Sequence, residues 1–343
     1  MRSIHDTETP VESLLDMLHG SWKTQALGAA AELRIADRIA EGHTDVRALA
    51  SACDCDVDAL HRLLGSLASL GLCIEDGDGH LALTPLGDCL RDDSPDSIRA
   101  WVLWWSQHLL PVWVQLPYSV RYGLEARSRV TGEAGFSSLE KSPERAALFN
   151  TAMSELTRLV ATHVACDYDF PAYGLITDLG GGQGTLLAAI LARHPASRGL
   201  LFDLPHALDK AAACLAAQGV SARCTCVAGD FFDAVPENAD VYMMKSILHD
   251  WDDARARDLL HTCRRAMRPD ARLLVIEHLM PDRMEACRAH QSLARLDLSM
   301  LVALGARERS EAEYRALLDA AGFAVTRIMP TGMAFHLIEA TPR

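Results

Sequence analysis

Short apolar runs alternate with helical stretches over the second half of the chain, from Leu175 onward. The runs are LITDLG, GLLFDL, RCTCVAGD, ADVYMMKSIL and RLLVIEHLM, and helical patterns separate them. This alternation is typical of a parallel sheet built from strand, helix and strand units. The last segment, FAVTRIMPTGMAFHLIEA, has two strand-like runs joined by Pro-Thr-Gly. We therefore expect an α/β fold whose mostly parallel sheet ends in an antiparallel hairpin.

The N-terminal pattern is different. Residues 12–40 are rich in Ala and Leu and predict a helix that ends at Gly42. Two short helical patterns follow, and then LCIEDGDGHLALT, whose apolar stretches flank a turn and predict a hairpin. Three helices and a hairpin form a winged-helix pattern. Residues 98–160 are helical in character, and WVLWWSQHLLPVW predicts a core or an interface, with Trp105 as a candidate pocket residue.

A winged helix raises the possibility of a DNA-binding regulator. Between Thr44 and Arg91, however, eight acidic residues face three arginines. The formal net charge of −13 also opposes binding to nucleic acid, because phosphate contacts require Lys and Arg. We expect this helical module to pack against a second copy of itself and form a homodimer.

The composition of the chain excludes several other classes. It has 343 residues, 49% of them hydrophobic, which is enough for two domains. The N-terminus lacks the pattern of a signal peptide, and no apolar run reaches the length of a membrane helix. The ten cysteines lack zinc-site spacing and are expected to be reduced and mostly buried. These features predict a cytoplasmic protein with no membrane partner.

Four glycines follow the first strand-like run, in DLGGGQG. A P-loop is excluded because no Gly-Lys-Ser/Thr ends the cluster. The dinucleotide fingerprint lacks its third glycine, which weakens a dinucleotide site as an alternative but leaves it open. The pattern that fits is acidic-x-Gly-x-Gly-x-Gly, formed by Asp178, Gly180, Gly182 and Gly184. Such a loop lets a ligand approach the backbone closely, and its acidic residue suits a cationic group. Tight packing of a strand-to-helix turn is the alternative.

Acidic residues also end the next two strand-like runs. Asp203 in FDLP lies where an acceptor for ribose hydroxyls is expected, although it could instead cap a helix. Asp230 and Phe231 in GDFF offer an acceptor and an aromatic wall to an adenine. Three such strand ends on one sheet predict a nucleoside site without phosphate groups.

Motifs along nearly the whole chain carry a resemblance to a known family. They are LTPLG, FNTAM, DLGGGQG, FDLP, GDFF, LHDWDD and RERS. With them the chain resembles the class I S-adenosylmethionine-dependent O-methyltransferases of the small-molecule type, which include caffeic acid, hydroxyindole and bacterial natural-product enzymes. The resemblance implies a winged-helix dimerisation domain over residues 1–144 and a Rossmann-like catalytic domain with a seven-stranded sheet over residues 145–343.

The resemblance also implies a methyl donor and the residues that bind it. The cofactor would be S-adenosyl-L-methionine, the product S-adenosyl-L-homocysteine, and no metal would take part. The residues implied for donor binding are Asp178, Gly180, Gly182, Asp203, Leu204, Gly229, Asp230, Phe231, Lys245, Ser246 and Trp251.

A candidate base follows the fourth strand, in MMKSILHDWDD. His249 lies there, just beyond the carboxyl edge of the sheet. A neutral phenol, with a pKa of about 10, is a poor nucleophile, and a histidine with a pKa near 6.5 can accept its proton. Glu277 ends the fifth strand, and Glu308 precedes a helix with a predicted capping box. The resemblance implies that these two glutamates flank the histidine and stabilise its protonated form.

The substrate pocket is implied by the same resemblance. Its candidate residues are Phe149, Asn150, Met153, Asp250 and Met300. One position departs from the family, because relatives usually carry two glycines before Arg-Glu-Arg and this chain has Ala306 as the second. If that position requires a positive φ, the loop that carries Glu308 would be strained.

The sequence therefore predicts methylation of a hydroxyl on a small aromatic or polyketide-like natural product, as in antibiotic biosynthesis. Three alternatives stay open. The first keeps the donor but methylates carbon or nitrogen. The second uses the same fold for another reaction, such as a hydroxylation. The third is the DNA-binding regulator. Neither the acceptor nor its regiochemistry follows from the sequence.

Overall fold

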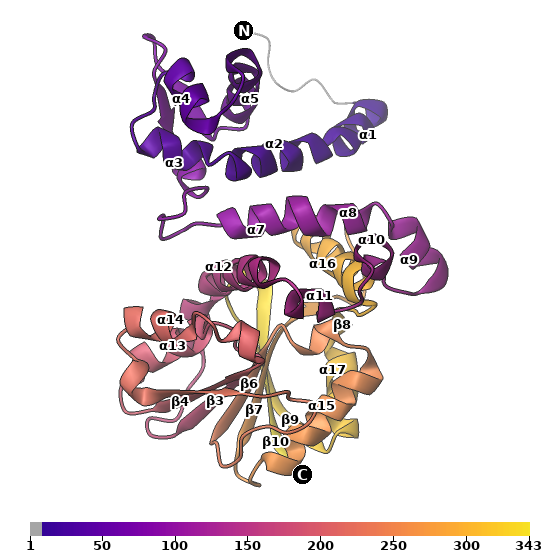
Figure 1. Ribbon diagram of the computed structural model, residues 1–343. Coiled ribbons are helices and arrows are strands. Elements are labelled where there is room, and N and C mark those ends of the chain that lie inside the picture. Colours follow the sequence, from indigo (N-terminus) through magenta and orange to yellow (C-terminus); the bar gives the residue numbers. More distant parts are fainter. Residues whose placement is uncertain (1–8) are drawn as a thin grey trace. The chain divides into compact units, whose positions relative to one another are not determined.

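The computed structural model describes residues 9–343, which divide into two compact units. The first unit extends to His108 and the second begins at Leu109. The sequence prediction placed the domain boundary later, between residues 144 and 145, at the start of a long helix. Each unit is described separately below, with the element labels of Figure 1.

The first unit combines helices with one hairpin. Its elements are α1 (Pro10–His19), α2 (Ser21–Glu32), α3 (Ile35–Ala40), α4 (Val46–Cys53), α5 (Val57–Ser69), β1 (Cys73–Glu75), β2 (Leu81–Leu83), α6 (Pro85–Asp88) and α7 (Arg99–Trp104). The prediction of a single helix over residues 12–40 was wrong. The chain turns at Gly20 and again at Arg34, whose φ of 56° no α-helix accommodates.

The predicted hairpin is confirmed. β1 and β2 pair antiparallel, with Ile74 opposite Ala82. α4 and α5 begin at Asp45 and Asp56, whose carboxylates accept backbone N–H groups of the first helical turn. These caps explain two of the acidic residues that oppose DNA binding. The core of this unit is formed by Ala and Leu side chains such as Leu49, which is fully buried.

The second unit contains ten helices, and a π-helical turn, η1 (Trp105–Leu109), spans the boundary between the two units in the sequence. The helices are α8 (Leu110–Trp113), α9 (Leu116–Tyr122), α10 (Arg127–Thr131), α11 (Ser137–Glu140), α12 (Pro143–Asp167), α13 (Thr185–Arg193), α14 (Ala211–Ala217), α15 (Asp253–Ala266), α16 (Arg288–Leu304) and α17 (Glu311–Ala320). Short 3-10 turns are η2 (Pro205–Ala207), η3 (Ser221–Arg223), η4 (Leu248–Asp250) and η5 (Gly332–Ala334).

A sheet with the strand order β5-β4-β3-β6-β7-β10-β9 forms the centre of the second unit (Figure 1). The strands are β3 (Leu175–Leu179), β4 (Arg198–Asp203), β5 (Cys224–Ala228), β6 (Val241–Lys245), β7 (Arg272–Met280), β9 (Phe323–Pro330) and β10 (Phe335–Pro342). All pairs are parallel except those of β10, and β8 (Arg309–Ser310) adds a short parallel pairing to β7. The predicted α/β fold, its seven strands and its closing hairpin are confirmed.

The apolar core lies on both faces of this sheet. Tyr242 and Met244 of β6 pack in one cluster with α15 and α17, whereas Val241 and Met243 pack in the other with α12, α13 and α14. Successive side chains of a strand point to opposite faces, so a strand covered on both sides is apolar throughout. This explains why the central runs of the sequence are continuous rather than alternating.

The order of the strands fixes where a ligand can bind. The chain runs outward from β3 to β4 and β5, and then returns to add β6 on the other side of β3. Ligands of open α/β sheets bind at such a switch point, beyond the carboxyl ends of the strands. The loops after β3, β4, β5 and β6 carry most of the predicted site residues.

All ten cysteines are free thiols, but the expectation that most are buried was wrong. Only Cys73 and Cys263 are buried, and Cys226 is exposed because β5 is an edge strand. Among the helices of residues 9–343, none is both long and apolar enough to cross a membrane.

Candidate active site

The glycine loop after β3 is shaped by positive φ angles and by close packing. Gly180 has a φ of 70°, and a Cβ there would lie 2.5 Å from Ile247 Cδ1. Gly182 has a φ of 57°, but a Cβ there would have no neighbour within 4 Å. Packing therefore requires glycine at Gly180, whereas Gly182 borders open space that a ligand can occupy.

Asp178 lies beneath this loop and is 1% exposed. A Cβ on Gly181 would lie 2.5 Å from the Asp178 carboxyl carbon, so the loop closes over the carboxyl group. Burial and the neighbouring Asp203 raise the pKa of Asp178 to about 7, and Lys245 opposes this shift. Lys245 donates from Nζ to Ser246 Oγ over 3.1 Å. Asp178 therefore has no open face toward a ligand, and its predicted role in donor binding would act through its charge.

Asp203 connects two loops of the site. Its carboxylate accepts hydrogen bonds from the backbone N–H groups of Gly182 and Leu204, each over 2.7 Å. The 3-10 turn that follows has no side-chain cap, so the alternative of Asp203 as a helix cap was wrong. Burial raises the pKa of Asp203, which the two N–H donors partly offset. Each carboxylate oxygen keeps a second lone pair that can accept a hydroxyl.

Aromatic rings gather beside the glycine loop. The Phe231 ring lies 3.5 Å from the Cβ position of Gly180 and packs edge-on against Trp251, with centroids 6.4 Å apart. Gly229 must be glycine because a Cβ would lie 2.6 Å from the Phe202 ring. Asp230 is exposed and caps its own turn by accepting from the N–H of the second residue after it. The structure thus brings the predicted adenine wall to the loop.

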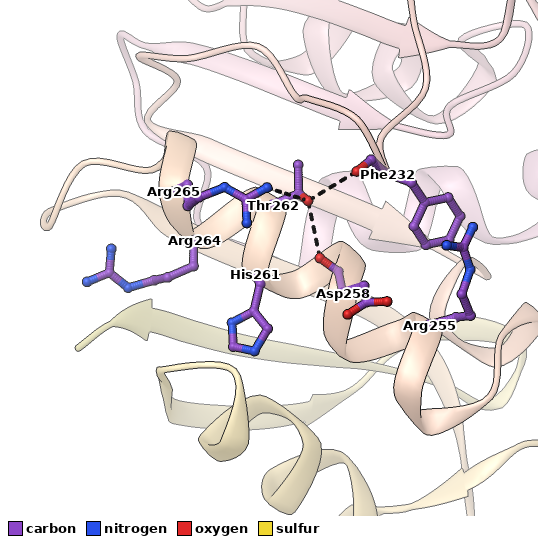
Figure 2. A pocket seen from close by; sticks show the side chains of 7 residues that line it. All are labelled: Phe232, Arg255, Asp258, His261, Thr262, Arg264 and Arg265. Atoms are coloured by element: carbon purple, nitrogen blue, oxygen red, sulfur yellow. Dashed lines mark hydrogen bonds between the residues drawn. The ribbon is translucent and has the colours of Figure 1, made fainter.

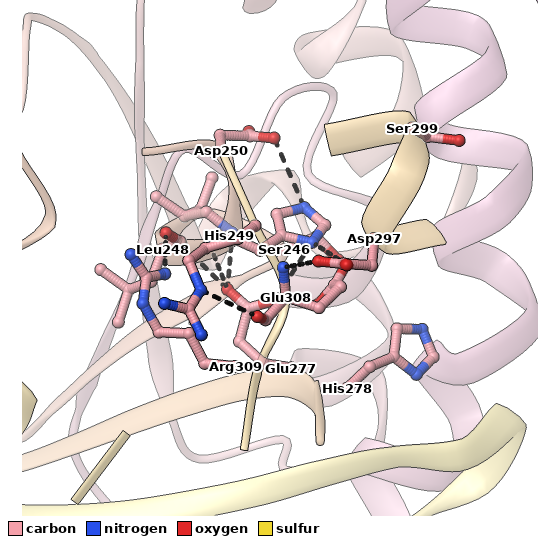
Figure 3. A network of polar contacts seen from close by, with 12 residues as sticks. Ser246, Leu248, His249, Asp250, Glu277, His278, Asp297, Ser299, Glu308 and Arg309 are labelled. Carbon is pink, nitrogen blue, oxygen red and sulfur yellow. Dashed lines mark hydrogen bonds and ion pairs between the residues drawn. The ribbon is translucent and has the colours of Figure 1, made fainter. Parts of the chain in front are cut away.

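His249 lies in η4 with carboxylates around its ring (Figure 3). Nδ1 is 2.7 Å from Glu308 Oε1 and 3.7 Å from Glu277 Oε2, and Nε2 is 3.5 Å from Asp250 Oδ1. Since Glu308 accepts the Nδ1 proton, the neutral imidazole carries its lone pair on Nε2. The structure therefore brings all three predicted catalytic residues together and assigns the basic atom.

The charges of this cluster raise the pKa of His249. Burial alone would lower it, but Glu308, Glu277 and Asp250 raise the pKa of His249 to about 10. Burial in turn raises the pKa of Glu277 to about 7 and that of Asp250 to about 6, against the pull of the histidine. The carboxylates around the ring therefore favour its protonated form.

Glu277 also shapes the backbone. Its Oε1 accepts the N–H groups of Ile247, Leu248 and His249 over 3.0, 2.9 and 3.4 Å. Ser246, just before this turn, has a φ of 54°, which is unusual for a residue with a side chain. One buried carboxylate thus gathers three donors and sets the turn on which the histidine lies.

The predicted substrate residues lie on separate elements. Asn150 of α12 is buried and donates to the backbone oxygen of His206 over 2.9 Å. The Phe136 ring lies between two others: its centroid is 5.9 Å from that of Phe149 and 6.2 Å from that of Trp251. The remaining candidates are Met153 on α12, Met300 on α16 and Trp105 in the π-helical turn, all partly buried. Their place in a pocket stays a prediction.

Sequence reasoning missed three residues of this region. Phe136 had no signal in the sequence, because a lone Phe in a polar loop is common. Asp297 of α16 accepts the N–H of Glu308 over 2.9 Å, and Arg309 is almost fully buried beside it. Arg309 stands in the quoted RERS motif, directly after Glu308, and this motif was the available signal.

Ala306 causes no strain. The left-handed conformation falls on Gly305, which ends α16 with a φ of 67°, and Ala306 is absent from the residues with a positive φ. A single glycine is enough to end the helix, so Glu308 reaches His249 without a second one.

The ligand atoms of His249, Glu277 and Glu308 lie within 4.8 Å of one another, as in a metal site. One Glu277 oxygen accepts three N–H groups, and Glu308 Oε1 contacts Nδ1 over 2.7 Å. Among the described residues, the Oε2 atom of each glutamate has no hydrogen-bond partner. The short Glu308 contact holds Nδ1 as a hydrogen-bond donor, which favours a proton-transfer role for the histidine.

A separate surface groove runs along α15 (Figure 2). It is lined by Phe232, Arg255, Asp258, His261, Thr262, Arg264 and Arg265. None of these is a predicted site residue.

Comparison with known proteins identifies the class. The sequence model of the O-methyltransferase domain matches residues 113–324, and that of the O-methyltransferase dimerisation domain matches residues 15–93. The chain therefore belongs to the O-methyltransferase family, as its motifs predicted. It is an S-adenosylmethionine-dependent methyltransferase.

Several relatives cover nearly the whole chain. O-demethylpuromycin-O-methyltransferase of Streptomyces alboniger is 42% identical over 335 residues, covering 96% of this chain and 89% of that protein. The crystal structure of LaPhzM has a TM-score of 0.93 at 39% identity and covers 98% of this chain and 100% of that one. NcsB1 comes from neocarzinostatin biosynthesis, and its structure holds S-adenosylmethionine and 2-hydroxy-5-methyl naphthoic acid. It has a TM-score of 0.79 at 35% identity and covers 94% of this chain and 96% of that one. Phenazine-1-carboxylate N-methyltransferase of Pseudomonas aeruginosa is 30% identical and covers 96% of both chains.

S-adenosylmethionine fits the residues around the glycine loop. The open side of Gly182 gives room for a ligand, and the free lone pairs of Asp203 suit the two ribose hydroxyls. The Phe231 ring offers an apolar face to an adenine. No basic side chain is needed there, because this nucleoside carries no phosphate.

Proposed function

We propose that this chain methylates a hydroxyl group of a small aromatic or polyketide-like natural product, with His249 as the general base. The observation that carries the proposal is the 2.7 Å contact between His249 Nδ1 and Glu308 Oε1, which leaves Nε2 as the basic atom of the site. Two further carboxylates, of Glu277 and Asp250, lie around the same ring.

The residues of the site would have four roles in this reaction. When bound, S-adenosylmethionine supplies an electrophilic methyl group on a sulfonium. Asp203, Gly182 and Phe231 would hold its nucleoside, and Asp178 beneath the loop would favour its positive charge. The acceptor oxygen would form a bond to this methyl group, the carbon–sulfur bond would break to leave the neutral thioether S-adenosylhomocysteine, and the O–H proton would pass to His249 Nε2. The imidazolium that forms is stabilised by the carboxylates that face it.

The raised pKa of His249 sets a condition on this step. A base must be neutral, and the ligand-free cluster favours the imidazolium. The positive charge of a bound sulfonium would oppose the carboxylates and favour the neutral form of His249 that can accept a proton.

The acceptor class rests on the relatives. NcsB1 was crystallised with 1,4-dihydroxy-2-naphthoic acid, and other relatives are an O-demethylpuromycin-O-methyltransferase and a phenazine O-methyltransferase. The second candidate function is N-methylation, which the Pseudomonas relative favours. A nitrogen acceptor already has a lone pair, so His249 would orient it rather than deprotonate it.

The test uses the full chain, S-adenosylmethionine and 1,4-dihydroxy-2-naphthoic acid. His249→Ala is expected to lower kcat by at least about 100-fold, since general base catalysis contributes on the order of 10² to 10⁴. Binding of S-adenosylhomocysteine, measured by calorimetry, should stay within a few fold. Product NMR locates the new methyl on oxygen or nitrogen. Unchanged turnover in His249→Ala would refute the general base.

The quaternary structure and location are part of the same proposal. We infer a homodimer through the first unit, because the dimerisation domain matches residues 15–93 and α1 exposes Val11, Leu14, Met17 and Leu18. Sedimentation of wild-type protein against Leu14→Glu tests this. The ten free thiols support a reducing compartment, and we propose the cytoplasm.

A further inference from the structure

Arg309 is a buried arginine that holds the turn of the proposed base. It is 1% exposed and lies in β8, directly after Glu308. Its Nη1 donates to the Leu248 carbonyl and its Nη2 to the Trp251 carbonyl, each over 2.7 Å. Its Nε donates to Asp253 Oδ1 over 2.9 Å. The two carbonyls therefore lie on either side of His249 in the sequence.

Side chains bind both the N–H groups and the carbonyl groups of the turn η4 (Figure 3). Glu277 of β7 accepts its N–H groups, and Arg309 of β8 donates to its carbonyls. β8 itself pairs with β7, Leu279 opposite Arg309, so both anchors share one rigid platform. A 3-10 turn has too few internal hydrogen bonds to fix itself, and these buried charged partners do so.

We propose that Arg309 is a positioning residue for the methyl transfer, acting through His249. This inference rests on the proposed function, because it assumes that His249 is the base. The guanidinium is suited to the task because the donors of its rigid planar fork lie on three separate nitrogen atoms, whereas the three donors of a lysine share one nitrogen. Loss of these bonds would let Nε2 move relative to the acceptor, and a displacement of about 1 Å can cost about 100-fold in rate.

The test compares Arg309→Lys with Arg315→Gln, an exposed arginine of α17 that pairs with Glu311. Arg309→Lys should lower kcat by about 10- to 100-fold. KM for 1,4-dihydroxy-2-naphthoic acid and the affinity for S-adenosylhomocysteine should stay within about threefold. Arg315→Gln should match the parent in all three. A kcat of Arg309→Lys within twofold of the parent would overturn the proposal.

A double-mutant cycle separates positioning from simple loss of structure. In the His249→Ala background, Arg309→Lys should have no further effect on kcat, because the group that it positions is gone. An additional loss of tenfold or more would show that Arg309 acts independently of His249 and would also overturn the proposal. If His249→Ala is itself fully active, the proposed base fails instead, whatever Arg309→Lys does.

A second variant covers the case in which Arg309→Lys does not fold. Asp253→Asn removes the charge that pairs with the guanidinium, at a side chain that is 59% exposed. It should lower kcat by about three- to tenfold with unchanged circular dichroism and a pH profile whose basic limb moves. An unchanged kcat and pH profile in this variant would count against the positioning role.

Discussion

Replacing Glu308 with glutamine gives the sharpest test of the catalytic cluster. The 2.7 Å hydrogen bond from His249 Nδ1 can survive this change, because the side-chain oxygen of glutamine still accepts a hydrogen bond. The negative charge beside the ring is lost. Glu308 makes the largest contribution among the carboxylates that raise the pKa of His249 from 6.5 to about 10. That shift corresponds to about 5 kcal/mol of net interaction, shared among three carboxylates and opposed by burial.

The expected result is a lower pKa of His249. Loss of the largest charge contribution should lower it by at least one unit, or about 1.4 kcal/mol. The pKa can be followed in the ligand-free protein by NMR of the imidazole Cε1 proton, assigned with His249→Ala. Glu311→Gln, on the exposed face of α17, is the matched control.

The same change should also lower the free energy of unfolding in a way that depends on pH. Because the folded-state pKa of His249 is raised, protonation stabilises the fold fully below pH 6.5, and this contribution is lost as pH rises towards 10. The free energy of unfolding of Glu308→Gln should therefore fall furthest below the parent between about pH 5 and 6.5, and the gap should close at high pH. A His249 pKa within 0.3 units of the parent, with a constant stability gap, would refute this reasoning.

Two further predictions concern the glycine loop and the sheet. Gly180→Ala should weaken S-adenosylhomocysteine binding at least tenfold by calorimetry, because its Cβ would strike Ile247. Gly219→Ala has a similar positive φ but open space, so retained affinity there isolates the packing effect. Tyr168→Phe removes a 2.6 Å hydrogen bond to a buried glutamate and should cost about 2 kcal/mol in urea unfolding, whereas the exposed Tyr173→Phe should cost almost nothing. Equal affinities of the two glycine variants, or equal free energies of unfolding of the two tyrosine variants, would contradict these predictions.

Part of the fold was predictable because its signals are local. The runs from Leu175 onward marked the strands, and Pro-Thr-Gly marked the final hairpin. The predicted helix over residues 12–40 failed for the same reason, since Ala and Leu continue through Gly20 and Arg34, where the backbone turns. Periodicity reports which face is apolar and not where packing forces a break.

The sequence by itself determined the chemical types at the strand ends: a glycine loop, an acid for a ribose and a histidine after the fourth strand. These follow from local spacing, because the carboxyl ends of parallel strands meet at one edge of a sheet. Only the tertiary structure decided that Glu308 contacts Nδ1 of a histidine 59 positions earlier, and that Arg309 clamps the same turn. Such pairings depend on the meeting of β6, β7 and β8, since the distance between side chains far apart in a chain is set by packing and leaves no periodic trace in the sequence.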